Sequence, residues 1–512
     1  MKVLSKRNII YYVGCFLSIS LLFCCFFLSY SEGNEFSQDK LISAVLILTE
    51  QWGSLLDKEQ LIEDIEKLTP LKAKASKESF IVNIVRAVRK QGVFLEAFAL
   101  ESKDITKLKE NKTAFISLLK NGDLCYVVKN IEIKNNKAVF SCILPDRKEI
   151  FIDERDFFSC WEGMVISKPL VNIKAKRLLN KEGDNKFVAL YFYHSGEDFN
   201  LLRKVLEKLK EEAERTNKKL IYIDELGLIP ERSIESYMKV NQIGEKEAFE
   251  LIKKMLNEDI SNVGKGVAIL GETNPFYRQL YQYLAKNKIE SYMEDLRYDA
   301  WKKIVVFDSM EYYSKAINYF FFNNIDKYIK SIERFIEGYW EYNIKRRDDD
   351  FRSQIKKIVA KHPNSLIFTI RGIGHYGMDN DINLDNLAVE TLVFGRGIFE
   401  DNLLHSQMYY ILLSNDIVMK ENDKKLAILK TYFEDTLRAY FVKKGLNIPE
   451  ATQLVCKISK RLKEKNVLKF SQAIYYAVIK QPEQLQEMWG FTYNWFKNQG
   501  FIKEEDLKVF QN

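Results

Sequence analysis

The stretch SLIFTIRGIGHYG (residues 365–377) decides the fold expected for the middle of this chain. It begins with a run of apolar and β-branched residues, which predicts a buried strand. Gly372, Gly374 and His375 follow that run directly. In open sheets of parallel strands, binding and catalytic sites form at the carboxyl ends of the strands. The stretch therefore predicts one strand of an α/β sheet, with a candidate functional histidine at its end.

Three apolar runs upstream are also followed directly by polar residues. The runs FVALYFYHSGEDF (187–199), KLIYIDELG (219–227) and IESYMEDL (289–296) lead into His194, Glu225 and Glu294. Long helical stretches separate the strands, and this alternation predicts an α/β domain over residues 187–400. The segment KRRDDDF (345–351) precedes the last strand and contributes Arg347. Histidines, carboxylates and an arginine at strand ends suit acid/base hydrolysis or a metal site.

Composition narrows the class of protein. Hydrophobic residues make up 46% and charged residues 29%, which is typical of globular chains and excludes a disordered one. The net charge is 78 − 71 = +7 with both signs interspersed, so the sequence predicts no nucleic-acid partner. Only four histidines occur, at positions 194, 362, 375 and 405. Two of these four follow apolar strands, which singles out His194 and His375.

The amino terminus predicts a membrane anchor. Lys2, Lys6 and Arg7 precede the 22 uncharged residues 9–30. As a helix, that run would be about 33 Å long, enough to span a bilayer. The basic flank predicts a single-pass membrane protein of bacterial type, with residues 32–512 outside the cytoplasm. A cleaved signal peptide is the alternative, although its apolar region is usually about 7–15 residues.

The rest of the chain divides by pattern. Residues 38–168 show helical periodicity first and short strand-like runs later, an α+β pattern. Residues 169–186 are rich in Lys and Asn and are expected to form a linker. Residues 401–512 show only helical periodicity. The predicted fold is thus an α+β domain, then an α/β domain with a helical carboxy-terminal extension, behind one transmembrane helix at residues 1–31.

The order of elements in 38–168 resembles the papain-like leader-peptidase domains of peptide-exporting ABC transporters. KLISAVLILTEQWG (40–53) matches the family's first helix, CYVV (125–128) its histidine-bearing strand, and FFSCWEGMV (157–165) its closing element. By this resemblance, Lys40, Cys125 and Leu144 occupy the positions of the catalytic Cys, His and Asp. A cysteine peptidase needs an imidazole to form its thiolate, and no histidine precedes His194. The sequence therefore predicts an inactive, peptidase-like domain.

The middle region resembles the Tiki/TraB superfamily, which includes erythromycin-esterase-like hydrolases. His194 matches the first histidine of its pattern, Glu225 and Glu294 its two glutamates, and Arg347 its arginine. Gly372, Gly374 and His375 match its closing motif, whereas Tyr191 stands where the family has a glycine. The resemblance implies a hydrolase, and it leaves open whether a divalent metal takes part.

Two interpretations follow from these patterns. In the first, the chain is an anchored extracytoplasmic hydrolase that uses His194, Glu225, Glu294, Arg347 and His375. One histidine would act as general base, and Arg347 would stabilise developing negative charge. In the second, both domains are degenerate, and the chain is a non-catalytic membrane protein that binds a peptide or a protein. The substrate and any cofactor are not determined by the sequence.

Overall fold

The chain forms two compact units, each built from separate stretches of sequence. The first contains the described residues up to Leu55 together with Ala114–Val165, and the second contains Leu56–Thr113 and the chain from Ile166 onward. The computed structural model describes residues 37–68, 77–105, 107–108, 113–120, 125–134, 137–178, 184–192, 199–224, 242–244, 246–247, 275–293, 309–382, 384, 386–394, 403–480 and 488–508.

The described part of the first unit combines two helices with an antiparallel sheet. Its elements are α2 (Gln38–Gln51), β2 (Phe115–Leu119), β3 (Cys125–Lys134), β4 (Lys137–Ile143), β5 (Glu149–Asp153), α6 (Glu154–Cys160) and β6 (Trp161–Ser167). Strands β2, β3, β4 and β5 pair antiparallel in chain order, and β5 is the edge strand. Stacking of Phe140 on Phe157, with ring centroids 3.9 Å apart, packs α6 against β4. Aromatic burial of this kind supplies much of a small core's stability.

The second unit contains a mixed sheet in the order β10-β9-β11-β8-β12-β7-β1. Neighbouring strands from β10 to β12 are parallel, whereas β7 pairs antiparallel with both β12 and β1. The strands are β1 (Glu96–Ala99), β7 (Ala175–Arg177), β8 (Asn185–Phe192), β9 (Lys219–Asp224), β10 (Glu290–Met293), β11 (Ser365–Gly372) and β12 (Leu387–Val393).

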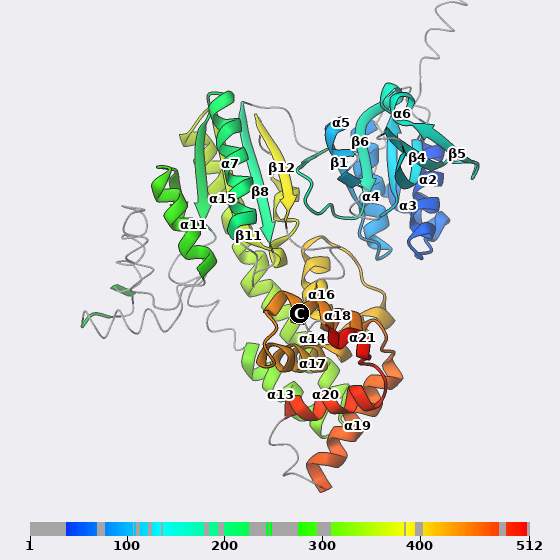
Figure 1. Ribbon diagram of the computed structural model, residues 1–512, viewed down its shortest axis with the longest axis vertical. Helices are drawn as coiled ribbons and strands as arrows, with labels where there is room; N and C mark the ends of the chain where they lie inside the picture. The colour runs from blue at the N-terminus through cyan, green and yellow to red at the C-terminus, as the bar shows by residue number, and fades with distance from the viewer. Residues whose placement is uncertain are drawn as a thin grey trace, which may run out of the picture. The chain divides into compact units, whose positions relative to one another are not determined.

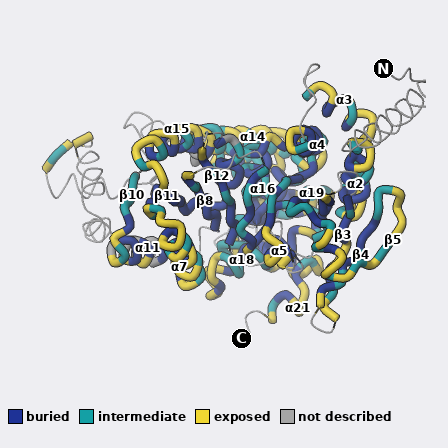
Figure 2. The backbone as a smooth tube through the Cα atoms, turned by 90° about the horizontal axis from the view of Figure 1, so that it is seen from above, coloured by how far each residue is buried: buried dark blue, intermediate teal, exposed yellow. Residues whose placement is uncertain are grey.

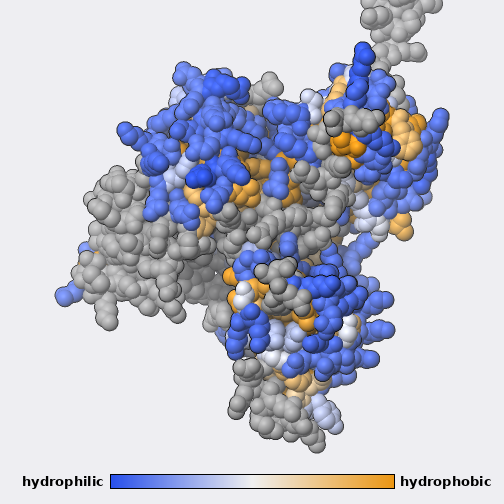
Figure 3. Space-filling view, viewed as in Figure 1, coloured by the Kyte–Doolittle hydropathy of each residue, from blue (hydrophilic) through white to orange (hydrophobic). Residues whose placement is uncertain are grey.

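Helices cover both faces of the parallel strands (Figures 1 and 2). Side chains of β11 alternate between the faces: Leu366, Phe368 and Ile370 pack toward α7 (Phe199–Arg215) and α11 (Pro275–Lys286), and Ile367 packs toward α15 (Arg346–Lys361). This alternation is the two-residue period of a strand, and burial on both faces explains the nearly continuous apolar run in the sequence. The outer face of α7 carries exposed, hydrophilic side chains (Figure 3).

The remaining elements of the second unit are helical. Near its amino end lie α3 (Lys58–Leu68), α4 (Lys77–Lys90) and α5 (Ser102–Ile105). A separate helical core contains large aromatic side chains such as Phe320, Phe433 and Phe496. Its helices are α13 (Ser309–Phe321), α14 (Ile325–Tyr339), α16 (His405–Ser414), α17 (Glu421–Lys443), α18 (Ile448–Ser459), α19 (Glu464–Lys480) and α20 (Met488–Asn498), followed by α21 (Glu504–Leu507).

The predicted fold class needs correction. The structure is α+β, with a mixed sheet and helices, because antiparallel β7 and β1 extend the parallel strands expected for an α/β domain. Strand β7 falls inside the stretch 169–186 that was expected to be a linker, and the stretch 38–168 is shared between the two units.

The expected transmembrane helix is corrected as well. Within the described part of the chain, no helix is both long enough and apolar enough to cross a membrane. The assignment of a single-pass membrane protein with an extracytoplasmic soluble part is therefore withdrawn. Residues 9–30, on which it was based, lie outside the described residues.

A four-membered ion-pair group ties α7 to the sheet. Glu212 of α7 bonds with Lys174 at 2.8 Å and also pairs with Lys186 of β8, and both lysines pair with Glu390 of β12. Burial raises the pKa of Glu212, but the hydrogen bonds from the two lysines outweigh it and lower that pKa to about 2. The ionised carboxylate is therefore favoured in the folded state.

This shift predicts a specific acid sensitivity. Because the folded pKa of Glu212 lies below its ordinary value, its stabilisation is present above about pH 4.5 and is lost as pH falls toward about 2. Glu212→Gln should remove roughly 2–3 kcal/mol at neutral pH and flatten the dependence of stability on pH in that window. Urea unfolding at several pH values measures this. The exposed neighbour Glu211, changed to Gln, is the control and should change little; an unaltered pH profile for Glu212→Gln would contradict the assignment.

Candidate functional site

The carboxyl end of β11 carries a buried histidine. Strand β11 ends at Gly372, and the short 3-10 helix η3 (Ile373–His375) follows at once. The His375 side chain is only 4% exposed. Because β8, β9, β10 and β11 are parallel, their carboxyl ends lie at the same edge of the sheet. His375 therefore stands where the sequence predicted a site.

Only part of the predicted residue set can be placed. His194, Glu225 and Glu294 lie outside the described residues. His375 and Arg347 are both described and both buried. Arg347 lies in the first turn of α15, next to Asp348 in sequence. The structure thus brings the first turn of α15 to His375.

The direct partner of His375 is Asp348. The His375 Nδ1 atom lies 2.7 Å from Asp348 Oδ1, and Asp348 is 3% exposed. An ionised carboxylate can only accept hydrogen bonds, so the imidazole donates through Nδ1–H. That tautomer leaves the lone pair on Nε2, the arrangement a general base requires.

Arg371 completes the buried charge group. It is the penultimate residue of β11 and has no exposed surface. Its Nη1 atom donates to Asp348 Oδ1 at 3.0 Å, and its guanidinium lies 3.9 Å from the centroid of the Phe351 ring. The carboxylate and the ring face both favour the guanidinium charge, which would otherwise be strongly unfavourable at this depth. Arg371 therefore fixes Asp348 and compensates its charge.

A π-helix precedes the turn that carries Arg347 and Asp348. Helix α14 continues directly into the π-helix η2 (Trp340–Lys345) and then into α15. A π-helical turn inserts extra residues into a helix and rotates everything beyond it, and such turns are common at functional sites. In this chain the π-helix stands directly before the first turn of α15, which carries Arg347 and Asp348.

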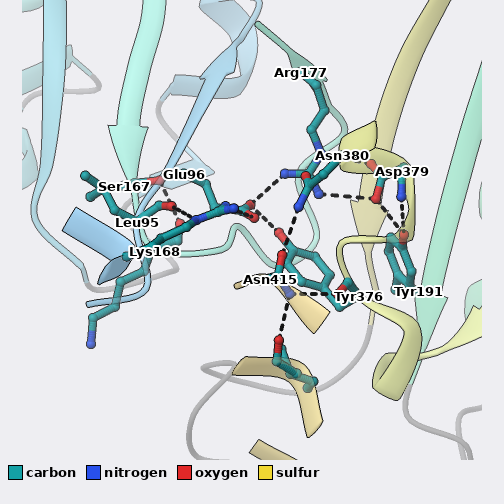
Figure 4. A network of polar contacts seen from close by, with 12 residues as sticks. Leu95, Glu96, Ser167, Lys168, Arg177, Tyr191, Tyr376, Asp379, Asn380 and Asn415 are labelled. Atoms are coloured by element: carbon teal, nitrogen blue, oxygen red, sulfur yellow. Dashed lines mark hydrogen bonds and ion pairs between the residues drawn. The ribbon is translucent and has the colours of Figure 1, made fainter. Parts of the chain in front are cut away.

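A second polar network holds the segment after His375. Tyr376 donates to Glu96, and Tyr191 donates to Asp379 Oδ1 at 2.5 Å. Arg177 lies between the two carboxylates, with its Nε 2.8 Å from Asp379 Oδ2 and its Nη1 3.0 Å from Glu96 Oε2 (Figure 4). Burial and the neighbouring carboxylates raise the pKa of both tyrosines well above the ordinary value, so both stay protonated donors.

Gly377 permits the turn between the two ends of this network. Its φ of +99° is in the left-handed region, and a Cβ there would collide with the Asn415 side chain. Asn415 also donates to the carbonyl of Tyr376 at 2.8 Å. Gly377, two residues after His375, is thus required both by the backbone conformation and by close packing.

The degenerate triad positions lie in the first unit. Lys40 is exposed on α2, and Cys125 is buried at the start of β3, with its thiol donating to the Lys40 carbonyl at 3.6 Å. Leu144 follows β4 and closes a turn, accepting a hydrogen bond from the Arg147 backbone at 2.8 Å. Lys40 and Cys125 are therefore neighbours, but no side chain among the three can serve as a nucleophile paired with an imidazole.

In the part of the chain that the structure describes, neither a group of metal ligands nor the histidines His362 and His405 join the site. Among the described residues, no group of three or more His, Cys, Asp or Glu side chains is placed to hold a metal ion. His362 caps α15 and contacts Tyr292, and burial lowers its pKa below the ordinary value. His405 bonds to the buried Glu434 in the helical core. The metal variant of the hydrolase hypothesis has no support in the described part of the chain.

Sequence reasoning missed Asp348 and Arg371 as site residues. Asp348 was visible beside Arg347, but one of three consecutive aspartates on a helix normally indicates a solvated face. Arg371 was visible as the single charge in an otherwise apolar strand. A charge at such a position is buried and therefore needs a partner, which was the available signal.

Comparisons with known proteins identify no family for this chain. No family model matches it, and no curated protein matches it. Among solved structures, the peptidase domain of Streptococcus ComA, a bi-functional ABC transporter involved in a quorum sensing pathway, is similar. That alignment covers 27% of this chain and 96% of the ComA domain, with 18% sequence identity and a TM-score of 0.21. A TM-score of 0.21 is too low to assign a fold or a function to this chain. The comparisons also provide no support for the Tiki/TraB resemblance.

The network around Arg177 predicts a large stability loss on its disruption. Arg177→Met would remove the guanidinium from the buried Asp379 and leave the buried Glu96 with Arg89 as its guanidinium partner, which should cost about 3–5 kcal/mol of unfolding free energy. Urea unfolding measures the loss. Arg86→Met is the matched control, because Arg86 is exposed and should lose less than about 0.5 kcal/mol. Equal stability of the two variants would show that the network does not hold the second unit together.

Proposed function

We propose that the second unit is a hydrolase in which His375 acts as general base toward water. The observation that carries the proposal is the 2.7 Å bond between His375 Nδ1 and Asp348 Oδ1 at the carboxyl edge of parallel strands. A carboxylate in this position orients the imidazole and stabilises the imidazolium that forms during proton transfer.

The proposed reaction is attack of water on an ester or amide carbonyl. His375 Nε2 takes a proton from the water molecule while the water oxygen bonds to the carbonyl carbon. The bond from that carbon to the leaving group then breaks, and the imidazolium returns the proton to the leaving oxygen or nitrogen. Arg347 is assigned to the negative charge that develops on the carbonyl oxygen. His194, Glu225 and Glu294 remain candidate catalytic residues of the same site.

Arg371 is assigned a positioning role. It has no exposed surface and is bonded to Asp348, so it acts on the reaction through the carboxylate. Its Nη1 atom also lies 3.4 Å from His375 Nδ1.

Hydrolysis of a panel of esters and peptides by the full chain tests the proposal. His375→Gln should lower kcat/KM by about 10²–10⁴-fold, because a positioned general base contributes that much. Asp348→Asn should lower kcat by at least about 10²-fold with KM little changed, because it loses imidazole orientation rather than binding.

The control is His362→Gln, which makes the same change at a histidine outside the site. It should hydrolyse the panel at the wild-type rate. If His375→Gln and Asp348→Asn also match the wild-type rate, the site assignment is wrong. If the wild-type chain hydrolyses nothing in the panel, the hydrolase proposal fails and a non-catalytic role is favoured.

A peptide-binding role for the first unit is the second candidate. The observation that favours it is the edge strand β5, which pairs only with β4 in the described part of the chain and leaves Phe151 71% exposed. Unpaired backbone groups on an edge strand can accept an extended peptide as an additional strand.

Phe151→Lys tests this second role. A lysine would place a charge on the open edge and remove the apolar contact, so binding of extended peptides from a random library should fall about tenfold or more. The exposed Ile133→Lys on the neighbouring hairpin is the control. Unchanged binding by Phe151→Lys would exclude strand addition at β5.

A further inference from the structure

A pocket of about 320 Å³ lies in the second unit, and His375 is not among the residues that line it. One wall is the carboxy-terminal half of α4, and another is formed by β1 and the end of β7. Asn380 of the short 3-10 helix η4 (Met378–Asp381) and Ser414–Asp416 at the end of α16 complete the lining. This volume is at the small end of the range for ligand sites, so it suits a small molecule rather than a macromolecule.

The charged residues that line the pocket are mainly basic. Arg86, Arg89, Lys90 and Arg177 contribute four positive charges, and Glu96 and Asp416 contribute two negative ones, so the lining sums to 4 − 2 = +2. Arg86, Arg89 and Lys90 lie three and four residues apart on α4, which places them on one face of the helix. An anion is the ligand charge that this lining favours.

Several of these cations already have partners within the protein, and Lys90 pairs with Asp64 at 3.5 Å. Glu96 is already bonded to Arg89, Arg177 and Tyr376 inside the protein. Arg89 donates to the Leu95 carbonyl and to Glu96, which uses two of its five N–H groups. Arg86 forms no hydrogen bond or ion pair within the described part of the chain, and it lines the pocket. Guanidinium donors are therefore available to a ligand from two adjacent positions on α4.

The environment of Arg89 disfavours its positive charge. Its side chain is 14% exposed. Burial lowers the pKa of Arg89 below its ordinary value, Glu96 opposes that effect, and the positive charge of Arg177 adds to it. A bound carboxylate would relieve both the lost hydration and the repulsion.

The rest of the lining is apolar. Leu68, Val82, Val85, Ala97 and Leu178 contribute side chains from α3, α4, β1 and the residue after β7. A ligand that consisted only of a charged group would leave this surface in contact with water. Burial of a hydrocarbon body against it adds affinity in proportion to the apolar area covered.

We propose that this pocket binds a small organic carboxylate, with its anionic group between Arg86 and Arg89 and its apolar body against the aliphatic side chains. Planar guanidinium groups bind carboxylates through paired N–H···O bonds, which gives the site its preference for this head group. Neither His375 nor Asp348 lines this pocket, so binding can be tested without any turnover.

Isothermal titration calorimetry of the full chain with hexanoate, octanoate and 3-phenylpropionate tests the proposal. At least one of these acids should bind about tenfold or more tightly than acetate, inorganic phosphate and hexan-1-ol. Acetate and phosphate lack the apolar body, and hexan-1-ol lacks the charge. Arg86→Glu should weaken binding at least about tenfold, and Arg86→Lys should weaken it less, because the positive charge remains.

Arg155→Glu is the matched control, since Arg155 is an exposed arginine in the first unit, and it should bind as the wild type does. Unchanged binding by Arg86→Glu would overturn the proposal. Acetate or phosphate binding as tightly as the longer acids would overturn the apolar part of the site. Failure of all three acids to bind at millimolar concentration would overturn the proposal entirely.

Discussion

Arg177 is buried between Glu96 and Asp379, and the position of the segment that carries His375 depends on this arrangement. The three residues come from β7, β1 and the short helix η4 (Met378–Asp381). Strand β7 has only three residues and β1 only four, so their ladder contributes few hydrogen bonds. A guanidinium that satisfies two desolvated carboxylates supplies the specificity that such short strands lack, because each group is strongly unfavourable at this depth without its partners.

His375 is consequently held from two directions. On one side, Asp348 and Arg371 fix the imidazole itself. On the other, Tyr376, the next residue, is tied to Glu96 and to Asn415. A side chain restrained in this way keeps one orientation, which is what a general base requires and what a solvated loop histidine would lack. The same restraints explain why so many polar side chains are buried together in an otherwise apolar sheet.

The local pattern of the sequence predicted much of the fold but not its pairing. The apolar runs that became β8, β9 and β11 were recognisable because strands buried on both faces read as continuous hydrophobic segments. Strand β7 was not recognisable, because its three residues, AKR, are too few to show the alternation of apolar and polar residues that marks a strand. The run FLEAFAL (94–100), one of the short strand-like runs in 38–168, became β1. Its antiparallel partner is β7, about eighty residues away, and pairing over that distance leaves no local signal.

The site residues were likewise predictable only where a local sequence pattern marked them. His375 was predicted from its position after a strand, whereas Asp348 and Arg371 acquire their role only when α15 packs on β11. The account therefore depends most directly on the Asp348–His375 bond. Long-range ¹H–¹⁵N correlation of the His375 ring, assigned with His375→Gln, measures it. The account predicts a protonated Nδ1 and an unprotonated Nε2 near neutral pH, with that preference lost in Asp348→Asn. A ring protonated on Nε2 alone in the wild type would contradict it.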